Sequence, residues 1–127
     1  MRTNILGTSL EQAEKLVNAG LNPDTADLHY SNEGVENYDM TIRMETYKDA
    51  KVRYANIEFD LFFAYSPAWS IGTLWNILHQ SGLKYAPTTL TMDSRRLLDL
   101  LVIWVIDALN QSRISQEFLT SAEASEE

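Results

Sequence analysis

The chain has no cysteine among its 127 residues. This absence excludes disulfide bonds, thiolate catalysis and zinc or iron–sulfur centres held by cysteine, and it favours a reducing compartment. Glycine is also scarce, because only 5 glycines occur and they are spread singly. A dinucleotide-binding loop or a Walker phosphate loop needs several glycines at short spacing, so neither is present. We therefore expect no cofactor and a cytoplasmic location.

Positive charge is scarce as well. The chain carries 10 basic and 18 acidic residues, a formal net charge of -8, and its only concentrated basic pair is Arg95-Arg96. Nucleic acids and anionic membranes are bound through basic patches, so the sequence predicts neither as a partner. The most apolar stretch, residues 97–109, is interrupted by two aspartates and is too short to cross a bilayer. The opening MRTNILGTSLEQ has no apolar run of signal-peptide length.

Apolar residues are plentiful. Hydrophobic residues make up 45% of the chain and aromatic residues 10%, which is enough to build one core in a chain of this length. We predict a single α+β domain over residues 1–113. A disordered acidic tail is predicted over residues 114–127, because periodicity ends after Arg113 and the last residues, TSAEASEE, are small and acidic.

Helices are predicted over residues 9–19, 70–80 and 94–110. The first opens on overlapping capping boxes at Thr8 and Ser9, the second on Ser70, and the third on Asp93 or Ser94. A shorter helical segment is expected after the Asn-Pro pair at residues 22–23, ending near residue 28. The last helix is apolar nearly all round, so it is either central to the fold or packed on a second copy.

Strands are predicted over residues 38–47 and 52–65. In the first strand, apolar and polar residues alternate. In the second, the apolar residues switch from even to odd positions near Ala55-Asn56, and a bulge of one extra residue there would keep them all on the same face. A third strand over residues 84–90 is an option that Pro87 restricts to a sheet edge. The expected fold is therefore α+β: a small antiparallel sheet of two to three strands with about three helices packed mainly on one face.

Two histidines are the first candidates for chemistry. His29 follows Asp24 and Asp27, a grouping that suggests a metal or acid–base site. A metal site needs three or four convergent ligands, so we favour a surface histidine beside solvated carboxylates. His79 lies near the end of a predicted helix, where an imidazolium complements the helix dipole.

The remaining polar candidates have structural interpretations. Ser66 and Ser70 fit a turn and a helix cap, and no Gly-x-Ser-x-Gly elbow is present. Glu58 and Asp60 share one face of a predicted strand and are interpreted as its solvated side. The sequence thus predicts no catalytic residue and no metal ligand, and it leaves the binding residues unassigned.

Trp69 has two interpretations. It precedes the Ser70 cap, and Leu74 follows at the position that a hydrophobic staple requires. Tryptophan is also common in binding hot spots, so an exposed anchor for a partner is the alternative. We favour the staple.

Three segments resemble a group of uncharacterised small acidic proteins of gut bacteria and their phage-like or mobile elements. They are LEQAEKL at residues 10–16, AGLNPDTAD at residues 19–27 and SPAWSIGTLWNIL at residues 66–78. The last is similar to that group's Pro-Ala-Trp/Phe-Ser-Leu turn and helix, and residues 97–109 are similar to its closing amphipathic helix. The resemblance implies a bacterial cytoplasm or a phage-infected cell and an accessory role, with no activity or functional residue.

Three hypotheses for function follow. The first is a non-enzymatic accessory protein-interaction domain with an unidentified protein partner or a second copy as its occupant. The second, motivated by the negative charge, is an acidic inhibitor or nucleic-acid-mimicking decoy that binds a basic host protein. The third is a small enzyme that uses scattered acids with His29 or His79.

Overall fold

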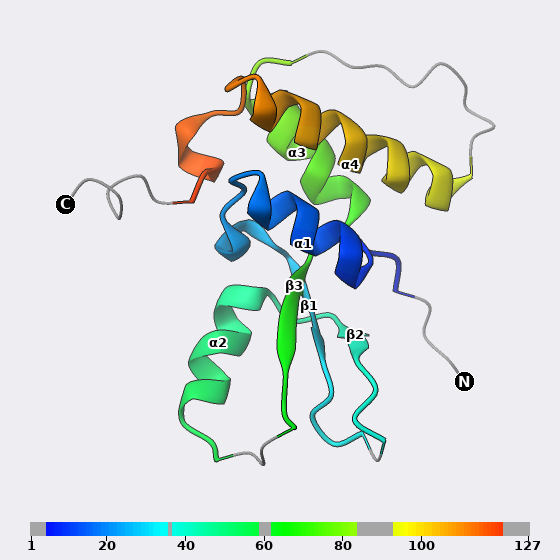
Figure 1. Cartoon of the computed structure of the whole chain (residues 1–127), viewed down its shortest axis with the longest axis vertical. Coiled ribbons are helices and arrows are strands. Elements are labelled where there is room, and N and C mark those ends of the chain that lie inside the picture. The colour runs from blue at the N-terminus through cyan, green and yellow to red at the C-terminus, as the bar shows by residue number, and fades with distance from the viewer. Residues whose placement is uncertain (1–4, 36, 59–61, 84–92, 121–127) are drawn as a thin grey trace.

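The computed structural model describes residues 5–35, 37–58, 62–83 and 93–120 (Figure 1). Its α+β class is the one that the sequence predicts. The elements, in chain order, are α1 (Leu10–Asn18), the 3-10 turn η1 (Pro23–Thr25), β1 (Leu28–Ser31), β2 (Thr41–Arg43), α2 (Tyr47–Ala55), β3 (Tyr65–Ala68), α3 (Ile71–Gln80), α4 (Ser94–Asn110) and the 3-10 turn η2 (Gln116–Phe118).

The sheet is antiparallel and has the strand order β2-β1-β3. Its central strand, β1, falls where the sequence predicts the end of a short helix, and that prediction is wrong beyond η1. In β1 the side chains of both faces are largely covered: Leu28 on one face, and His29 and Ser31 on the other, are buried. A strand covered on both faces shows no alternation of apolar and polar residues, which is why the pattern did not reveal it.

Helix α2 occupies residues 52–55, the beginning of the strand predicted over residues 52–65, and β3 begins only at Tyr65. The Thr46 side chain caps α2 by accepting a hydrogen bond from the Asp49 main-chain N–H at 3.1 Å. Its inward residues, Ala50 and Tyr54, are one helical turn apart, whereas Val52 is 65% exposed. The other predicted strand, 38–47, contains only the short β2, and the strand predicted over residues 84–90 lies outside the described residues.

The helices lie at two places along the sheet. Figure 1 shows α1, α3 and α4 gathered at one end, with α2 beside the strands nearer the other end. The Tyr54 ring of α2 meets His29, with centroids 5.7 Å apart. On the opposite face, Leu28 and Ile42 approach Gly7 so closely that a Cβ there would lie within 3 Å of both side chains. Helix α2 therefore covers the face of the sheet that carries His29, and Gly7, which precedes α1, lies against the other face.

The main core lies between α1, α3 and α4, and Trp69 is fully buried in it. The indole N–H of Trp69 donates to Thr25 Oγ1 at 2.9 Å, and its main-chain N–H donates to Thr8 Oγ1 at 3.0 Å. Leu74 belongs to the same buried cluster, as a staple requires. The alternative of an exposed Trp69 anchor is wrong.

The segment after α4 corrects the predicted tail. Ile114 is buried, Leu119 forms a β-bridge with Leu21, and the Thr120 N–H donates to the Gly20 carbonyl at 2.8 Å. Residues 114–120 are therefore part of the fold, and their irregular apolar spacing reflects a 3-10 turn instead of an α-helix. Residues 121–127, where the prediction also placed the tail, lie outside the described residues.

Helix α4 is central, and the chain itself covers most of its apolar surface. Its buried residues are Leu98, Leu101, Val102, Val105, Ala108 and Leu109. Ile103, on the opposite side, is 61% exposed. Among the described residues, no helix combines the length and the apolar character that crossing a membrane requires.

This orientation of α4 predicts that two similar substitutions lower the free energy of unfolding by different amounts. Leu101→Ala removes a fully buried side chain and should lower the free energy of unfolding by about 2–5 kcal/mol. Ile103→Ala, two residues away, should lower it by less than about 1 kcal/mol. Urea unfolding followed by circular dichroism measures both, and equal losses would contradict this packing.

Candidate functional site

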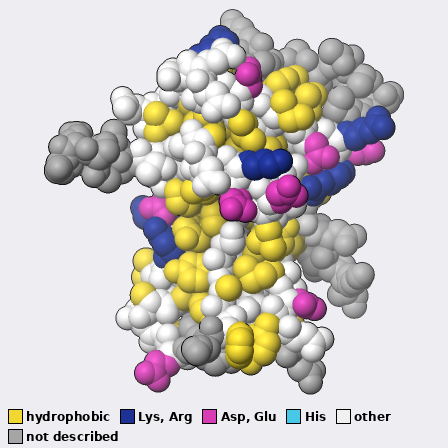
Figure 2. Space-filling view, in the orientation of Figure 1, with side chains coloured by type: hydrophobic (Ala, Val, Ile, Leu, Met, Phe, Trp, Pro, Cys, Tyr) yellow, Lys and Arg dark blue, Asp and Glu magenta, His cyan; other side chains and the backbone are white. Residues whose placement is uncertain are grey.

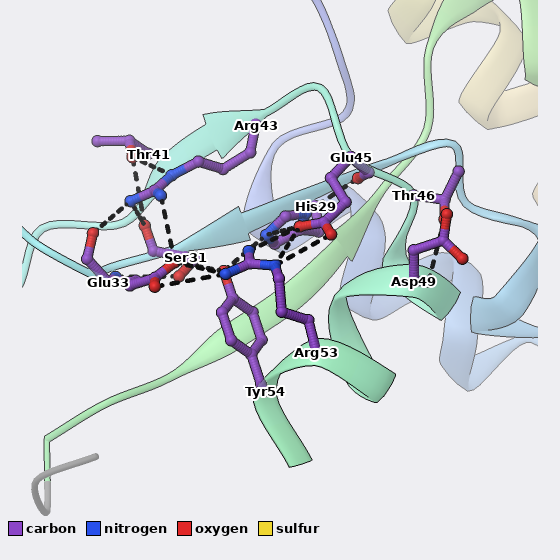
Figure 3. Close-up of polar contacts among 10 residues, drawn as sticks. All are labelled: His29, Ser31, Glu33, Thr41, Arg43, Glu45, Thr46, Asp49, Arg53 and Tyr54. Atoms are coloured by element: carbon purple, nitrogen blue, oxygen red, sulfur yellow. Dashed lines mark hydrogen bonds and ion pairs between the residues drawn. The ribbon is translucent and has the colours of Figure 1, made fainter. Parts of the chain in front are cut away.

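His29 lies in the middle of the sheet and is completely buried. Its Nδ1 is 2.9 Å from the main-chain carbonyl oxygen of Glu45, and its Nε2 is 3.0 Å from the Tyr54 hydroxyl. Both ring nitrogens therefore have partners, one from the segment after β2 and one from α2 (Figure 3). The prediction of a surface histidine beside solvated carboxylates is wrong, because strand β1 places this ring under α2.

The two aspartates that precede His29 in the sequence have other partners. Asp24 Oδ1 lies 2.6 Å from Lys51 Nζ, which links η1 to α2. Asp27 accepts hydrogen bonds from the Ser70 main-chain N–H at 2.9 Å and from the Ser70 hydroxyl at 2.6 Å. These carboxylates fix η1 and the start of α3, and the grouping that suggested a metal or acid–base site does not form.

Four charged residues surround the buried ring instead: Glu33, Arg43, Glu45 and Arg53. The Arg53 guanidinium bridges the two carboxylates, with Nη2 2.7 Å from Glu45 Oε1 and Nη1 3.2 Å from Glu33 Oε1. Arg43, on β2, donates to the Glu33 carbonyl at 2.7 Å. The hydrogen bond from Arg53 holds the pKa of Glu45 below its usual value, and the same contact raises the pKa of Arg53.

Tyr54 joins the imidazole to this charged group. Its hydroxyl lies 3.0 Å from His29 Nε2 and 3.2 Å from Glu33 Oε1. Its ring packs against Phe63 and Tyr65, each with centroids 4.9 Å away, and the Arg53 guanidinium carbon lies 4.4 Å from its centre. We call His29, Glu33, Glu45, Arg53 and Tyr54 the histidine cluster.

The polar side chains of the histidine cluster form hydrogen bonds and ion pairs with one another. Two of the pockets in the described part of the chain are not lined by these residues. One, of about 360 Å³, lies between α1 and β3, and the other, of about 430 Å³, lies beside the segment that follows α4. Within the described residues, no three histidine, aspartate or glutamate side chains are placed to hold a metal ion.

Comparison with known proteins adds nothing to this geometry. No family model, no curated protein and no solved structure matches the chain. The resemblance to small acidic proteins of gut bacteria stays a prediction.

The remaining candidates from the sequence are dispersed. Ser70 caps α3 as predicted, accepting a hydrogen bond from the Thr73 N–H at 3.3 Å. His79 is exposed near the end of α3, and Glu58 is exposed after α2. Ser66 lies in β3, and Asp60 lies outside the described residues.

A second feature, which the sequence did not indicate, is an exposed aromatic pair. Tyr38 and Phe62 have ring centroids 5.4 Å apart and are 46% and 69% exposed. They come from the loop between β1 and β2 and from the loop before β3. Tyr38 is the first residue of the strand predicted over residues 38–47, and it lies outside β2. We call Tyr38 and Phe62 the aromatic tip.

The lowered pKa of Glu45 predicts how stability depends on pH. A carboxyl group whose folded-state pKa is lowered stabilises the fold above its unfolded-state pKa, about 4.3, and this contribution is lost as pH falls through the folded-state value. At pH 7, Glu45→Gln should cost roughly 0.5–1 kcal/mol, because solvent partly screens the pair with Arg53. In acid, the difference from the wild type should shrink.

The control for this prediction is Glu58→Gln, which neutralises an exposed carboxylate. Urea unfolding at a series of pH values measures all three proteins. A cost of Glu45→Gln that stayed constant from neutral to acid pH would contradict the assigned pairing, as would an equal, pH-dependent cost for Glu58→Gln.

Proposed function

We propose that this chain is a non-enzymatic protein-interaction domain and that the aromatic tip is its binding anchor. The observation that carries the proposal is the exposure of two neighbouring aromatic rings at the end of a sheet. Tyrosine and other large aromatic side chains supply much contact area for little conformational entropy, and they are typical of binding hot spots. In accord with the cysteine-free sequence, we place this function in the cytoplasm, as an accessory role.

The aromatic tip is supported by a buried amide. Asn32 is only 6% exposed, and its Nδ2 donates to the Phe62 carbonyl at 2.8 Å while its Oδ1 accepts from the Ala64 N–H at 3.0 Å. The Asn32 main-chain N–H also donates to the Ala64 carbonyl at 3.3 Å. One side chain thus ties the loop after β1 to the loop before β3. Such support presents the rings with less entropy to lose on binding.

The backbone at Tyr38 is a second support for the proposal. Its φ is 61°, in the left-handed region, which costs a residue with a Cβ about 1–2 kcal/mol. Strained backbone of this kind concentrates at binding and catalytic sites. Here the strain orients a half-exposed tyrosine ring beside Phe62.

The acidic residues beside the aromatic tip indicate the charge of its partner. Asp39, which directly follows Tyr38, and Glu58, which follows α2, are exposed. Residues 21–42 and 54–83 contain no lysine and no arginine. A partner that complements this surface presents an apolar anchor flanked by basic side chains. Complementary charge raises the association rate and rejects acidic competitors.

The other hypotheses have less support. A decoy for nucleic-acid-binding proteins needs a stripe of carboxylates, whereas Glu33 and Glu45 are paired with arginines. The acidic side chains on the face drawn in Figure 2 are scattered. An enzyme needs substrate access to its reacting groups, and the His29 ring is completely buried. Self-association through α4 loses its main motivation, because the chain itself buries most of that helix.

A peptide selection tests the proposal without a known partner. A random library displayed on phage is selected on the wild-type protein and depleted on Phe62→Ala. The retained peptides should carry lysine or arginine around an apolar residue. Tyr38→Ala should weaken the binding of a synthetic copy at least about tenfold, which corresponds to about 1.4 kcal/mol.

Val52→Ala is the matched control, because Val52 is as exposed as Phe62 but lies on α2. Its affinity for the same peptide should equal that of the wild type. The proposal would be overturned by retained peptides that are acidic, or by an equal loss of affinity in the Val52→Ala and Tyr38→Ala variants.

A further inference from the structure

The histidine cluster contains one hydrogen atom for which two acceptors compete. The Glu45 main-chain oxygen can only accept, so the hydrogen bond to His29 Nδ1 requires a hydrogen on that nitrogen. In a neutral imidazole, Nε2 then carries no hydrogen and must accept from the Tyr54 hydroxyl. The Glu33 carboxylate, 3.2 Å from the same hydroxyl, also only accepts. Tyr54 has a single hydroxyl hydrogen and cannot serve both.

Protonation of His29 removes this competition. With a second hydrogen on the ring, Nε2 donates to the Tyr54 oxygen, and the Tyr54 hydroxyl is released to donate to Glu33. Every contact in the series from Glu45 through His29 and Tyr54 to Glu33 then has its own hydrogen. The proton arrives from solvent, and no bond between heavy atoms changes.

We propose that His29, Tyr54 and Glu33 form a proton-operated switch, in which protonation of His29 turns the Tyr54 hydroxyl from His29 to Glu33 and tightens the loop that carries the aromatic tip. Its use in partner binding rests on the proposed function. The rearrangement itself requires only the contacts described above.

The groups that face the ring come from each neighbouring element. Glu45 Oε1, from the segment after β2, lies 4.0 Å from His29 Nε2 and attracts an imidazolium. Glu33 follows β1, Arg43 belongs to β2, and Arg53 and Tyr54 belong to α2. The positive charges of the two arginines balance the negative charges of the two glutamates. Protonation of His29 therefore changes the net charge of this group of residues. From β3, the Tyr65 ring contacts Tyr54, and Tyr65 also contacts Tyr47 of α2.

The route from Glu33 to the aromatic tip is short and hydrogen-bonded. The Glu33 N–H donates to Ser31 Oγ at 3.0 Å, at the end of β1. The Val35 N–H donates to the Asn32 carbonyl, and the Tyr38 N–H donates to the Val35 carbonyl, both at 3.1 Å. Two successive turns thus connect the residues beside the switch to Tyr38. Fixing the Glu33 side chain restrains the first of these turns.

A pH titration by NMR of the full chain tests the switch. The ring nitrogens of His29 and His79 are followed by ¹⁵N chemical shifts, and the loop by the amide signals of Glu33, Val35 and Tyr38. We expect the three amide signals to move with the same midpoint as His29. They should not follow exposed His79, which serves as the internal control.

The variants separate the switch from a general effect of pH. In Tyr54→Phe, which has no hydroxyl hydrogen, the amide signals should no longer follow His29. Tyr47→Phe, a tyrosine on the same helix whose ring packs on Tyr65, should keep the wild-type response. The proposal would be overturned by an unchanged amide response in Tyr54→Phe, by amide signals that follow only the carboxyl groups, or by a His29 ring that does not titrate in the folded protein.

The experiment uses the free protein, so its result does not depend on whether the aromatic tip binds a partner. Repeating the affinity measurement with the selected peptide above and below the His29 midpoint tests the regulatory link. We expect an affinity that changes across this midpoint in the wild type and stays constant in Tyr54→Phe. A constant wild-type affinity would overturn the regulatory link and leave the binding surface itself supported.

Discussion

The sheet half of this protein depends on the burial of a polar ring, His29, in its central strand. A buried imidazole is costly unless both of its nitrogens are hydrogen-bonded. Glu45 supplies one partner through its main-chain oxygen, and Tyr54 supplies the other. To satisfy His29, α2 must therefore lie against β1 with Tyr54 inward. The aromatic packing of Tyr54 with Phe63 and Tyr65 then joins this helix to β3 and the loop before it.

The two halves of the molecule are stabilised by different forces. Around α1, α3 and α4, buried aliphatic side chains and Trp69 form a continuous apolar core. Around α2 and the far end of the sheet, hydrogen bonds, ion pairs and ring contacts prevail, and several large apolar side chains stay exposed. Polar networks change with protonation, whereas an aliphatic core does not. The half that presents the aromatic tip is thus the half that pH can alter.

Local sequence signals predict the helices well and the strands poorly. Ser9, Ser70 and Asp93 cap α1, α3 and α4 as expected, because capping depends on residues within one turn. Helix α2 has only two buried residues, so its apolar face is too narrow to show periodicity. Strand β1 is covered on both faces and lacks alternation. These two elements are defined by their contact with each other, which no local pattern reports.

The candidate site illustrates the same limit. The sequence drew attention to His29 but paired it with the nearby Asp24 and Asp27. Its actual partners, Glu45 and Tyr54, are 16 and 25 residues further along the chain. The aromatic tip combines residues from two loops that Asn32 joins, and only the folded chain brings them together.

A double-mutant cycle between His29 and Tyr54 measures how strongly this contact holds α2 on the sheet. The free energy of unfolding is measured for the wild type, His29→Leu, Tyr54→Phe and the double variant at constant pH. If this contact holds α2 on the sheet, the two substitutions should be non-additive, with a coupling energy of about 1–2 kcal/mol. Additive losses, with a coupling energy near zero, would show instead that other contacts hold α2 on the sheet.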